Sequence, residues 1–509
     1  MPTASHGEAL DADFGCANHY SQCRNFVESF FSSIHYIHPI LDRREFLQKC
    51  EALWSANTDN VGNHPTSSFV ALYYSVLSLG AIVAVREEDS ASGLSNLQWS
   101  RKFFEIARTY CKQLGLVTDL EMVQCFFMMA KVCQNELNPH WSYMYVGLAV
   151  RTALAMGVNR DPGPGTRKTV PQLKAESRTW WEISFSIGRP DTLGADIYHN
   201  RRLPLIKNDT VTEHDSEMLE PPHCAIIGCA VDLARITRTI CQKIYLPNPS
   251  IIDMITLTNQ IERELDDWVG SLPPAIRPDT QNQLQQKVSL RSAKDAQWAK
   301  RQRLVLSIRY HNLKILLFGS LLIRSSPTER TNIPGCLENT HKCLESAKQT
   351  ISIIYQTYAH NDFFQTWFYN TTYTVFAASV VLLYITQDSA SHEEARSLFE
   401  LVNMAVEILE IMDECVVALE AARLLRSVRE KAESRLSSET TPTYNQEPVS
   451  HAGPELDLLF THVEGHSIQL NHYWGPLGLI DGSGMDFDIA AQLGAFDQNN
   501  PMFFSLGER

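Results

Sequence analysis

The sequence predicts an all-α protein with a multi-helix body and a flexible, acidic C-terminal tail. Apolar residues recur at helical spacing in nearly every segment up to about residue 435. The same region lacks the sustained apolar/polar alternation that is typical of half-buried strands. Hydrophobic residues make up 44% of the 509 residues and charged residues 20%, which is the balance of a globular protein with a real core. Because domains usually hold about 100–200 residues, two or three packed units are expected.

The chain is expected to contain three segments. These are a flexible N-terminus at 1–20, a helical body at 21–435 and a linker with an acidic, aromatic tail at 436–509. The body could divide again near 207–222. The first residues have no apolar stretch behind a positive start, so we expect no secretory signal and a chain that stays inside the cell.

The first predicted helix places four apolar side chains on one face, at Phe26, Phe30, Ile34 and Ile37. It should end at His38-Pro39, because a proline ring clashes with the preceding helical turn. Asp42 and Glu45 then form a capping pair for the next helix.

The longest apolar run, Phe69 to Val85, predicts a buried helix. Polar residues and a glycine interrupt it, and it falls short of the roughly 20 residues that span a bilayer. No membrane contact is therefore expected. Thr118 and Glu121 offer a second capping pair, ahead of another apolar stripe.

Helical spacing continues from Trp141 to Met156, and Gly157 stands where a left-handed C-cap residue is favoured. Residues 161–165 are rich in proline and glycine and indicate a loop. Another helix should end at Leu272-Pro273-Pro274. Later helices are predicted near 296–323, 340–358, 364–386 and 393–434.

The segment 437–509 differs in kind, because it holds ten acidic residues and a single basic one, Arg509. Pro442–Pro454 reads as a linker. Beyond the linker, acidic and bulky apolar residues alternate, so the segment should be disordered when alone. It could still offer apolar anchors to a coactivator groove, and the predicted anchors are Leu459, Phe460, Phe487 and Phe496.

Five stretches, in order along residues 20–430, resemble the fungal-specific transcription factor domain. This domain is the helical middle region of the zinc binuclear-cluster regulators. The stretches are Phe26 to Leu47, Gly147 to Pro162, Trp180-Trp181 followed by Gly188-Arg189-Pro190, Leu265 to Pro278, and Tyr310 to Leu313.

The resemblance implies a nuclear regulator of RNA polymerase II transcription, of the kind that often controls a metabolic or secondary-metabolite pathway. Its acidic tail would engage the transcription machinery or a coactivator. A small-molecule effector or partner that prefers one packing of the helices could expose or hide the tail. Such a chain could form a homo- or heterodimer.

The resemblance also implies an N-terminal cluster of six cysteines that holds two zinc ions and reads DNA. Only Cys16 and Cys23 lie near the start, and two thiols cannot fill a tetrahedral zinc site. The net charge of −14 also repels a phosphate backbone. We therefore expect no metal ligand and no DNA-binding residue in this chain, zinc only if a missing cluster exists, and DNA contact only through a missing module or a partner.

One stretch departs from the family pattern. Between the paired aromatics and Gly-Arg-Pro, the family is longer by about two helical turns of about 3.6 residues each. Here only Glu182 to Ile187 intervene, so the segment Trp181–Gly188 reflects either divergence or a gene-model error. We expect a shortened helix whose neighbours lose apolar cover.

The sequence leaves two alternatives to a transcription regulator that lacks its own zinc cluster. One is a cluster-less co-regulator that dimerises with a DNA-binding relative. The more distant one is a helical enzyme similar to terpene synthases, with Glu264, Asp266 and Asp267 as magnesium ligands. A third acid one turn on is missing from that cluster, so the ion would have too few oxygen ligands. We expect no catalytic residue and no enzyme activity, and we interpret these acids as a charged helix face.

Two Cys/His groupings and three basic clusters could suggest further sites. His223 with Cys224 and Cys229, and Cys336 with His341 and Cys343, lack paired ligand arms and are interpreted as core thiols. The basic clusters are too short for a nuclear import signal and are expected to be solvated faces: Arg43-Arg44, Arg201-Arg202 and Lys300-Arg301-Gln302-Arg303.

Overall fold

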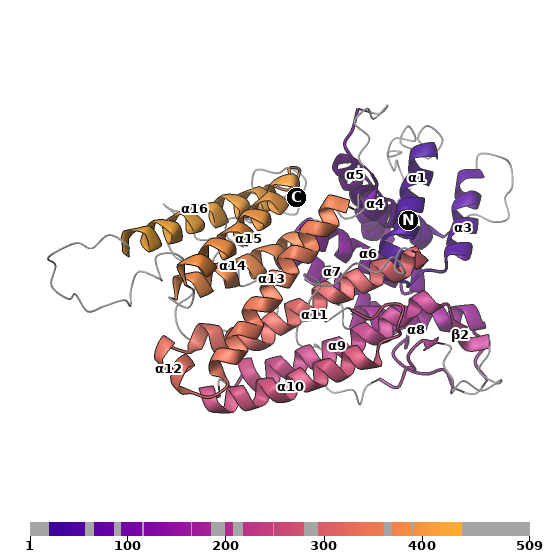
Figure 1. Cartoon of the computed structure of the whole chain (residues 1–509). Helices are drawn as coiled ribbons and strands as arrows, with labels where there is room; N and C mark the ends of the chain where they lie inside the picture. Colours follow the sequence, from indigo (N-terminus) through magenta and orange to yellow (C-terminus); the bar gives the residue numbers. More distant parts are fainter. Residues whose placement is uncertain are drawn as a thin grey trace, which may run out of the picture. The chain divides into compact units, whose positions relative to one another are not determined.

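The computed structural model is helical through nearly all of the residues it describes, which confirms the all-α prediction (Figure 1). Two short strands are the exception. The predicted acidic tail and its four anchors lie outside the described residues. Those residues are 20–55, 66–85, 93–114, 117–163, 165–184, 199–206, 217–247, 249–278, 294–360, 369–387 and 391–439.

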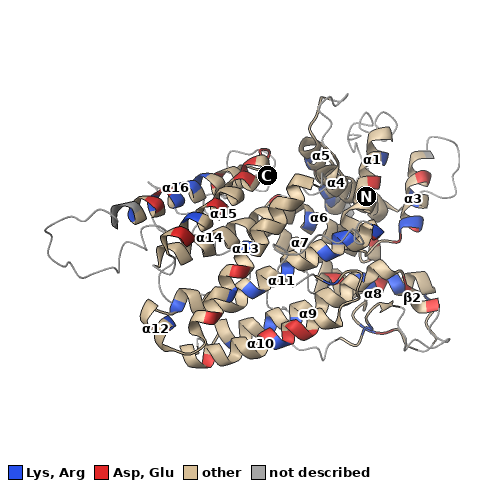
Figure 2. Cartoon of the chain, viewed as in Figure 1, with Lys and Arg blue, Asp and Glu red and all other residues tan. Residues whose placement is uncertain are grey.

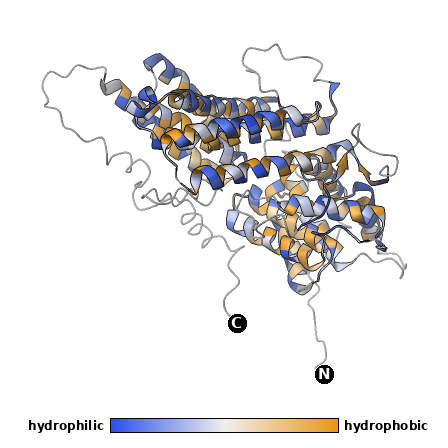
Figure 3. Cartoon of the chain, turned by 90° about the horizontal axis from the view of Figure 1, so that it is seen from below, coloured by the Kyte–Doolittle hydropathy of each residue, from blue (hydrophilic) through white to orange (hydrophobic). Residues whose placement is uncertain are grey.

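The chain divides into two compact units. The first comprises Met1–Val132, Met144–Ile183 and Ile197–Cys224, and the second comprises Cys133–Tyr143, Ser184–Asp196 and Ala225–Arg509. In both units the helix ribbons carry hydrophobic and hydrophilic stripes, as amphipathic helices around a core should (Figure 3).

The first unit is built around α4, which packs against both α1 and α5. Its two strands, β1 and β2, pair in parallel, with Leu205 opposite Leu219. The elements of this part of the chain are α1 (Tyr20–Ser32), α2 (Ile34–Ile37), α3 (Arg43–Ser55), α4 (Ser67–Val83), α5 (Asn96–Leu114), α6 (Leu120–Asn135), α7 (Pro139–Ala155), α8 (Val170–Ser184), β1 (Leu205–Ile206), β2 (Leu219–Glu220) and η4 (Pro222–Cys224).

Helix α4 is the buried helix predicted from the long apolar run. Nearly all of its side chains are buried, and Gly80 allows the backbone of α1 to approach closely. A Cβ atom at Gly80 would lie 2.0 Å from the carbonyl oxygen of Phe26. Among the described residues, none of the helices combines the length and apolar character needed to cross a membrane.

Two local predictions in the first unit were wrong. The first helix stops at Ser32 instead of reaching Ile37, because the Ser33 N–H bonds the Phe30 carbonyl in a tighter turn and α2 then starts afresh. The cap of α6 is Asp119 rather than Thr118, since Asp119 Oδ1 accepts the Met122 N–H at 2.8 Å.

Two other predicted helix ends are confirmed. Asp42 Oδ1 accepts the Glu45 N–H at 3.0 Å at the start of α3. Gly157 follows α7 with φ of +72°, the left-handed conformation that glycine adopts without strain.

In the second unit, helices that follow one another in the sequence pack together. Helix α13 contacts α14, α14 contacts α15, and α15 contacts α16 (Figure 1). Helix α11 also packs along α13. The elements are α9 (Ala225–Ile240), η5 (Cys241–Tyr245), α10 (Ile251–Ser271), α11 (Gln297–Arg324), α12 (Pro327–Asn332), α13 (Cys336–His360), α14 (Asn370–Thr386), α15 (His392–Ile411) and α16 (Val416–Glu439).

The single helix predicted at 393–434 is in fact two helices, α15 and α16. Met412 is fully buried and leaves the helical backbone, and the Cys415 N–H then bonds the Met412 carbonyl at 2.8 Å to form the turn. The stop predicted at Leu272-Pro273-Pro274 is confirmed, because α10 ends at Ser271 with Leu272 as its cap.

Candidate functional site

Helix α8 of the first unit carries charged side chains into the interior. Arg178 donates from Nη1 to Glu220 Oε2 at 2.8 Å, and their side chains are only 6% and 1% exposed. A charge buried this deeply needs a partner, and each residue supplies the other's. Arg178 Nε and Glu220 Oε1 have no further hydrogen-bond partner among the described residues. Burial raises the pKa of Glu220, against the opposing effect of Arg178.

Two histidines lie beside this ion pair. The rings of His35, on α2, and His223, on η4, have centroids 5.4 Å apart. Burial lowers the pKa of His35 well below its usual value, and His223 and Arg178 add to the effect. Burial followed by the charge of Arg178 also lowers the pKa of His223. Both imidazoles are therefore neutral at physiological pH.

A second contact joins α8 to the chain that follows α2. His38 Nδ1 lies 2.8 Å from Glu182 Oε2, with side chains 13% and 8% exposed. Gln124 of α6 donates to the Ile40 carbonyl at 3.2 Å and to Thr179 Oγ1 at 3.1 Å. We call the six residues that share this interior the α8 polar cluster: His35, His38, Arg178, Glu182, Glu220 and His223.

Arg201, in the segment before β1, is buried against the N-terminal half of α8, and this corrects one prediction. Arg201 Nη2 donates to the Leu173 carbonyl at 2.6 Å and Nη1 to the Arg160 carbonyl at 3.1 Å. Glu176 lies 3.3 Å from the same guanidinium. The Arg201-Arg202 pair is therefore not a solvated face, because only Arg202 reaches solvent, at 87% exposure.

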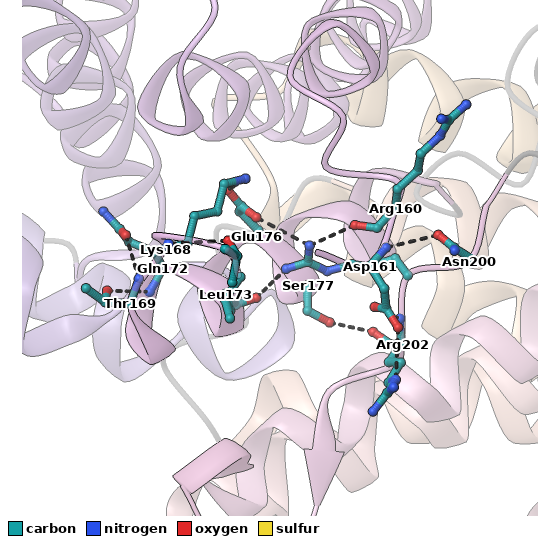
Figure 4. Close-up of polar contacts among 12 residues, drawn as sticks. Arg160, Asp161, Lys168, Thr169, Gln172, Leu173, Glu176, Ser177, Asn200 and Arg202 are labelled. Carbon is teal, nitrogen blue, oxygen red and sulfur yellow. Dashed lines mark hydrogen bonds and ion pairs between the residues drawn. The ribbon is translucent and has the colours of Figure 1, made fainter. Parts of the chain in front are cut away.

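The rest of this arrangement fixes the loop after α7 to α8. Glu176 also accepts from Lys168 Nζ at 2.7 Å. The Arg202 N–H donates to Asp161 Oδ1 at 2.9 Å, and the Asp161 N–H donates to Asn200 Oδ1 at 3.0 Å (Figure 4). Ion pairs thus hold the loop after α7 against α8, from Lys168 and Arg201 to Glu176 and from Arg202 to Asp161.

Comparison with known families covers the first unit and the first helices of the second. Residues 27–270 match the sequence model of the fungal specific transcription factor domain. The chain contains a fungal specific transcription factor domain. The resemblance predicted from the sequence is confirmed over this range, which holds all six residues of the α8 polar cluster.

Full-length relatives resemble the chain at low identity. Zinc finger protein grt1 of Schizosaccharomyces pombe is 23% identical over 403 residues, which are 75% of this chain and 58% of that protein. Activator of stress genes 1 of Saccharomyces cerevisiae is 21% identical over 435 residues, 81% of this chain and 43% of that protein. Transcription factor FBD3 of Gibberella moniliformis is 24% identical over 319 residues, 58% of this chain and 41% of that protein. The chain thus spans about half the length of the curated relatives it matches.

Within this fungal specific transcription factor domain, the α8 polar cluster offers little to catalysis. Burial raises the pKa of the neighbouring Cys224 thiol to about 12, so that thiol stays protonated and inert. In the part of the chain that the structure describes, no three His, Cys, Asp or Glu side chains are grouped to hold a metal ion. The cluster positions α2, α8 and β2 relative to one another.

Sequence reasoning missed this cluster. Arg178 and Glu182 flank the paired tryptophans, and charged residues at buried positions of α8 are the one signal that could have indicated it. Their partners, Glu220 and His38, lie far along the chain, so no local spacing identifies them.

The acids that suggested a terpene synthase lie on α10 of the second unit. Asp266 and Asp267 are exposed, and the Tyr310 hydroxyl donates to Asp266 Oδ1 at 3.5 Å. The buried-side acid of this helix, Glu262, already accepts from Lys314 at 2.9 Å and Lys342 at 2.8 Å. Helix α10 carries five acidic residues and one basic residue, Arg263, and its exposed acids are those of a solvated helix face (Figure 2).

The remaining sequence candidates have varied outcomes. The cysteines at 224, 229, 336 and 343 are buried free thiols. Arg301 is 6% exposed, so the basic cluster at 300–303 is not wholly a solvated face either. Trp180 is fully buried and α8 ends at Ser184, while the shortened segment up to Gly188 lies outside the described residues.

Proposed function

We propose that this chain is the regulatory region of a fungal transcription regulator that controls RNA polymerase II transcription in the nucleus. The match of residues 27–270 to the fungal specific transcription factor domain carries the proposal. Relatives named as an activator of stress genes and as a transcription factor support it.

The net charge and the charge distribution of the chain support a regulator whose helical body does not itself bind DNA. The net charge is −14, and the described helices in Figure 2 show both signs of charge interspersed. DNA affinity depends on concentrated Lys and Arg that displace counterions from phosphates. We therefore propose that DNA contact comes from another module or from a partner chain.

The acidic segment 437–509 is the proposed contact with the transcription machinery. Its sequence places bulky apolar residues beside acids, a composition that stays solvated yet can dock as an induced helix in an apolar groove. The acids would steer the encounter with a basic rim. The proposed anchors are Leu459, Phe460, Phe487 and Phe496.

Tethering the chain to a promoter tests this function. The full chain fused to an unrelated DNA-binding domain should activate a reporter gene, and a fusion of residues 1–436 should lose most of that activity. Replacing Phe487 and Phe496 together by Ala should reduce activation, whereas the matched acid replacement Asp486→Asn should leave most of it. A full-length fusion that is expressed, reaches the nucleus and leaves transcription unchanged would contradict the proposal.

A fluorescent fusion tests the proposed location separately. The full chain without any added import signal, or together with the partner that supplies one, should concentrate in the nucleus of a fungal cell. A cytoplasmic distribution under both conditions would contradict the proposed nuclear location, whatever the reporter experiment shows.

A further inference from the structure

The Cys111 thiol of α5 lies close to three sulfur atoms of α6 in the first unit. The Cys111 Sγ atom lies 3.7 Å from Cys125 Sγ, 3.9 Å from Met122 Sδ and 3.8 Å from Met129 Sδ. Cys111 is on the last turns of α5, and the other three sulfurs share one face of α6 at spacings of three and four residues.

Each of these three separations matches the distance between two sulfur ligands of one metal ion. Metal–sulfur bonds of about 2.3 Å place tetrahedral ligands about 3.8 Å apart and trigonal ligands about 4.0 Å apart. The three distances measured from Cys111 fall at these values. Ordinary core packing does not require that three sulfurs all approach the same thiol.

From this geometry we propose that Cys111, Met122, Cys125 and Met129 form a binding site for a soft monovalent metal ion, Cu(I). The donor set decides the metal, because thiolate and thioether sulfur select Cu(I) over harder ions. Zinc prefers thiolates and imidazoles and makes little use of thioethers.

Burial and charge fit a monovalent ion. Met122, Cys125 and Met129 are 1% exposed or less, while Cys111 is partly exposed and gives the ion an entry path. On binding, the Cys111 thiol gives up its proton to solvent, and its thiolate and Cu(I) form a neutral pair, which costs little to bury among thioethers.

Binding would join α5 to α6 and so stabilise the folded first unit. A ligand that binds the folded chain and not the unfolded chain raises the melting temperature by mass action. This inference is independent of the proposed transcriptional function, because the two rest on different residues and are measured in different assays.

The test is an anaerobic Cu(I) titration of the reduced full chain against a colorimetric Cu(I) chelator. All measurements use a Cys16→Ser background, because Cys16 lies outside the described residues. We expect one Cu(I) per chain, a higher melting temperature with Cu(I), and X-ray absorption that shows sulfur ligands at about 2.3 Å.

Single replacements assign the ligands. Cys111→Ser should abolish the uptake, and Met122→Leu or Met129→Leu should weaken the affinity at least tenfold. Leucine conserves the volume of methionine, so these variants should fold, and an unchanged circular dichroism spectrum checks that. Met144→Leu, at an exposed methionine of α7, is the matched control and should bind Cu(I) like the parent.

Three outcomes would overturn the proposal. They are Cu(I) uptake that survives Cys111→Ser, affinity that is unchanged in both Met122→Leu and Met129→Leu, and Zn(II) binding that competes equally with Cu(I). If the affinity is unchanged in both methionine variants and Cys111 and Cys125 form a disulfide in air, the group is a pair of neighbouring thiols and not a Cu(I) site.

Discussion

Arg178 on α8 and Glu220 on β2 form an ion pair 2.8 Å long whose side chains are 6% and 1% exposed. The pair joins two elements that lie 42 residues apart in the chain. Removing one partner leaves an unpaired charge in the interior and strongly destabilises the fold. Removing both partners leaves no unpaired charge.

Glu220→Gln should therefore lower the free energy of unfolding of the first unit by about 3–5 kcal/mol. Urea unfolding followed by tryptophan fluorescence measures the change, since Trp180 is buried on the same helix. The double replacement of Arg178 by Met and Glu220 by Leu should recover much of the loss. A double variant as unstable as the single one would show that the pair itself, rather than charge isolation, stabilises the unit.

Gly80→Ala should destabilise the packing of α4 on α1. The new Cβ would lie 2.0 Å from the Phe26 carbonyl oxygen, and a backbone atom cannot move aside cheaply. We expect a loss of about 1–3 kcal/mol, typical of an overpacked core. Gly147→Ala on α7 is the control, because no atom lies within 4 Å of its added Cβ and alanine favours helix by about 0.5–1 kcal/mol. Equal thermal stability of the two variants would contradict the close approach.

The corrected cap of α6 gives a further prediction. Asp119 Oδ1 accepts the Met122 N–H, and Asp119 Oδ2 accepts from Ser68 Oγ at 2.6 Å. Asp119→Ala should therefore cost about 1–2 kcal/mol, as loss of an N-cap does. Thr118→Ala, at the neighbouring exposed residue, should be close to neutral in the same denaturation experiment. The reverse ranking would restore Thr118 as the cap.

Local signals in the sequence predicted most helices and several of their ends. Helix ends set by backbone chemistry, such as Gly157 and Leu272-Pro273, were predictable because the reason lies within a few residues. Even there a neighbour one residue away can take the role, as Asp119 does. Helix α12 was missed although Ser326 and Glu329 form a complete capping box, because its six residues are too few to show a helical period.

The sequence could not predict which distant residues contact one another in the fold. Arg201 and Arg301 were expected to be solvated because arginine is rarely buried, yet both are 6% exposed. Arg201 is buried because two carbonyls and Glu176 from distant segments satisfy it. The sulfur site was hidden for the same reason, since Cys111 meets Cys125 across a helix-to-helix contact rather than within a motif.

His311 should make the second unit sensitive to acid. It lies on α11 and is 9% exposed, and burial, aided by the charge of Lys314, lowers its pKa to about 4. An unfolded histidine has a pKa of about 6.5, so between these two values the unfolded chain binds more protons than the folded chain. The stabilisation due to a neutral His311 is therefore complete above pH ~6.5 and is lost as the pH falls toward ~4.

The size of this effect is about 3.5 kcal/mol over the full window, since one pKa unit corresponds to about 1.4 kcal/mol. His311→Phe keeps a buried ring without a titrating group, so the unfolding free energy of the variant should fall less between pH 7 and pH 4.5. Hydrogen exchange of α11 amides measures the second unit without interference from His35 and His223 in the first. His392→Gln on the exposed start of α15 should keep the parental pH dependence. If His311→Phe kept it too, the acid sensitivity of α11 would have to come from another group.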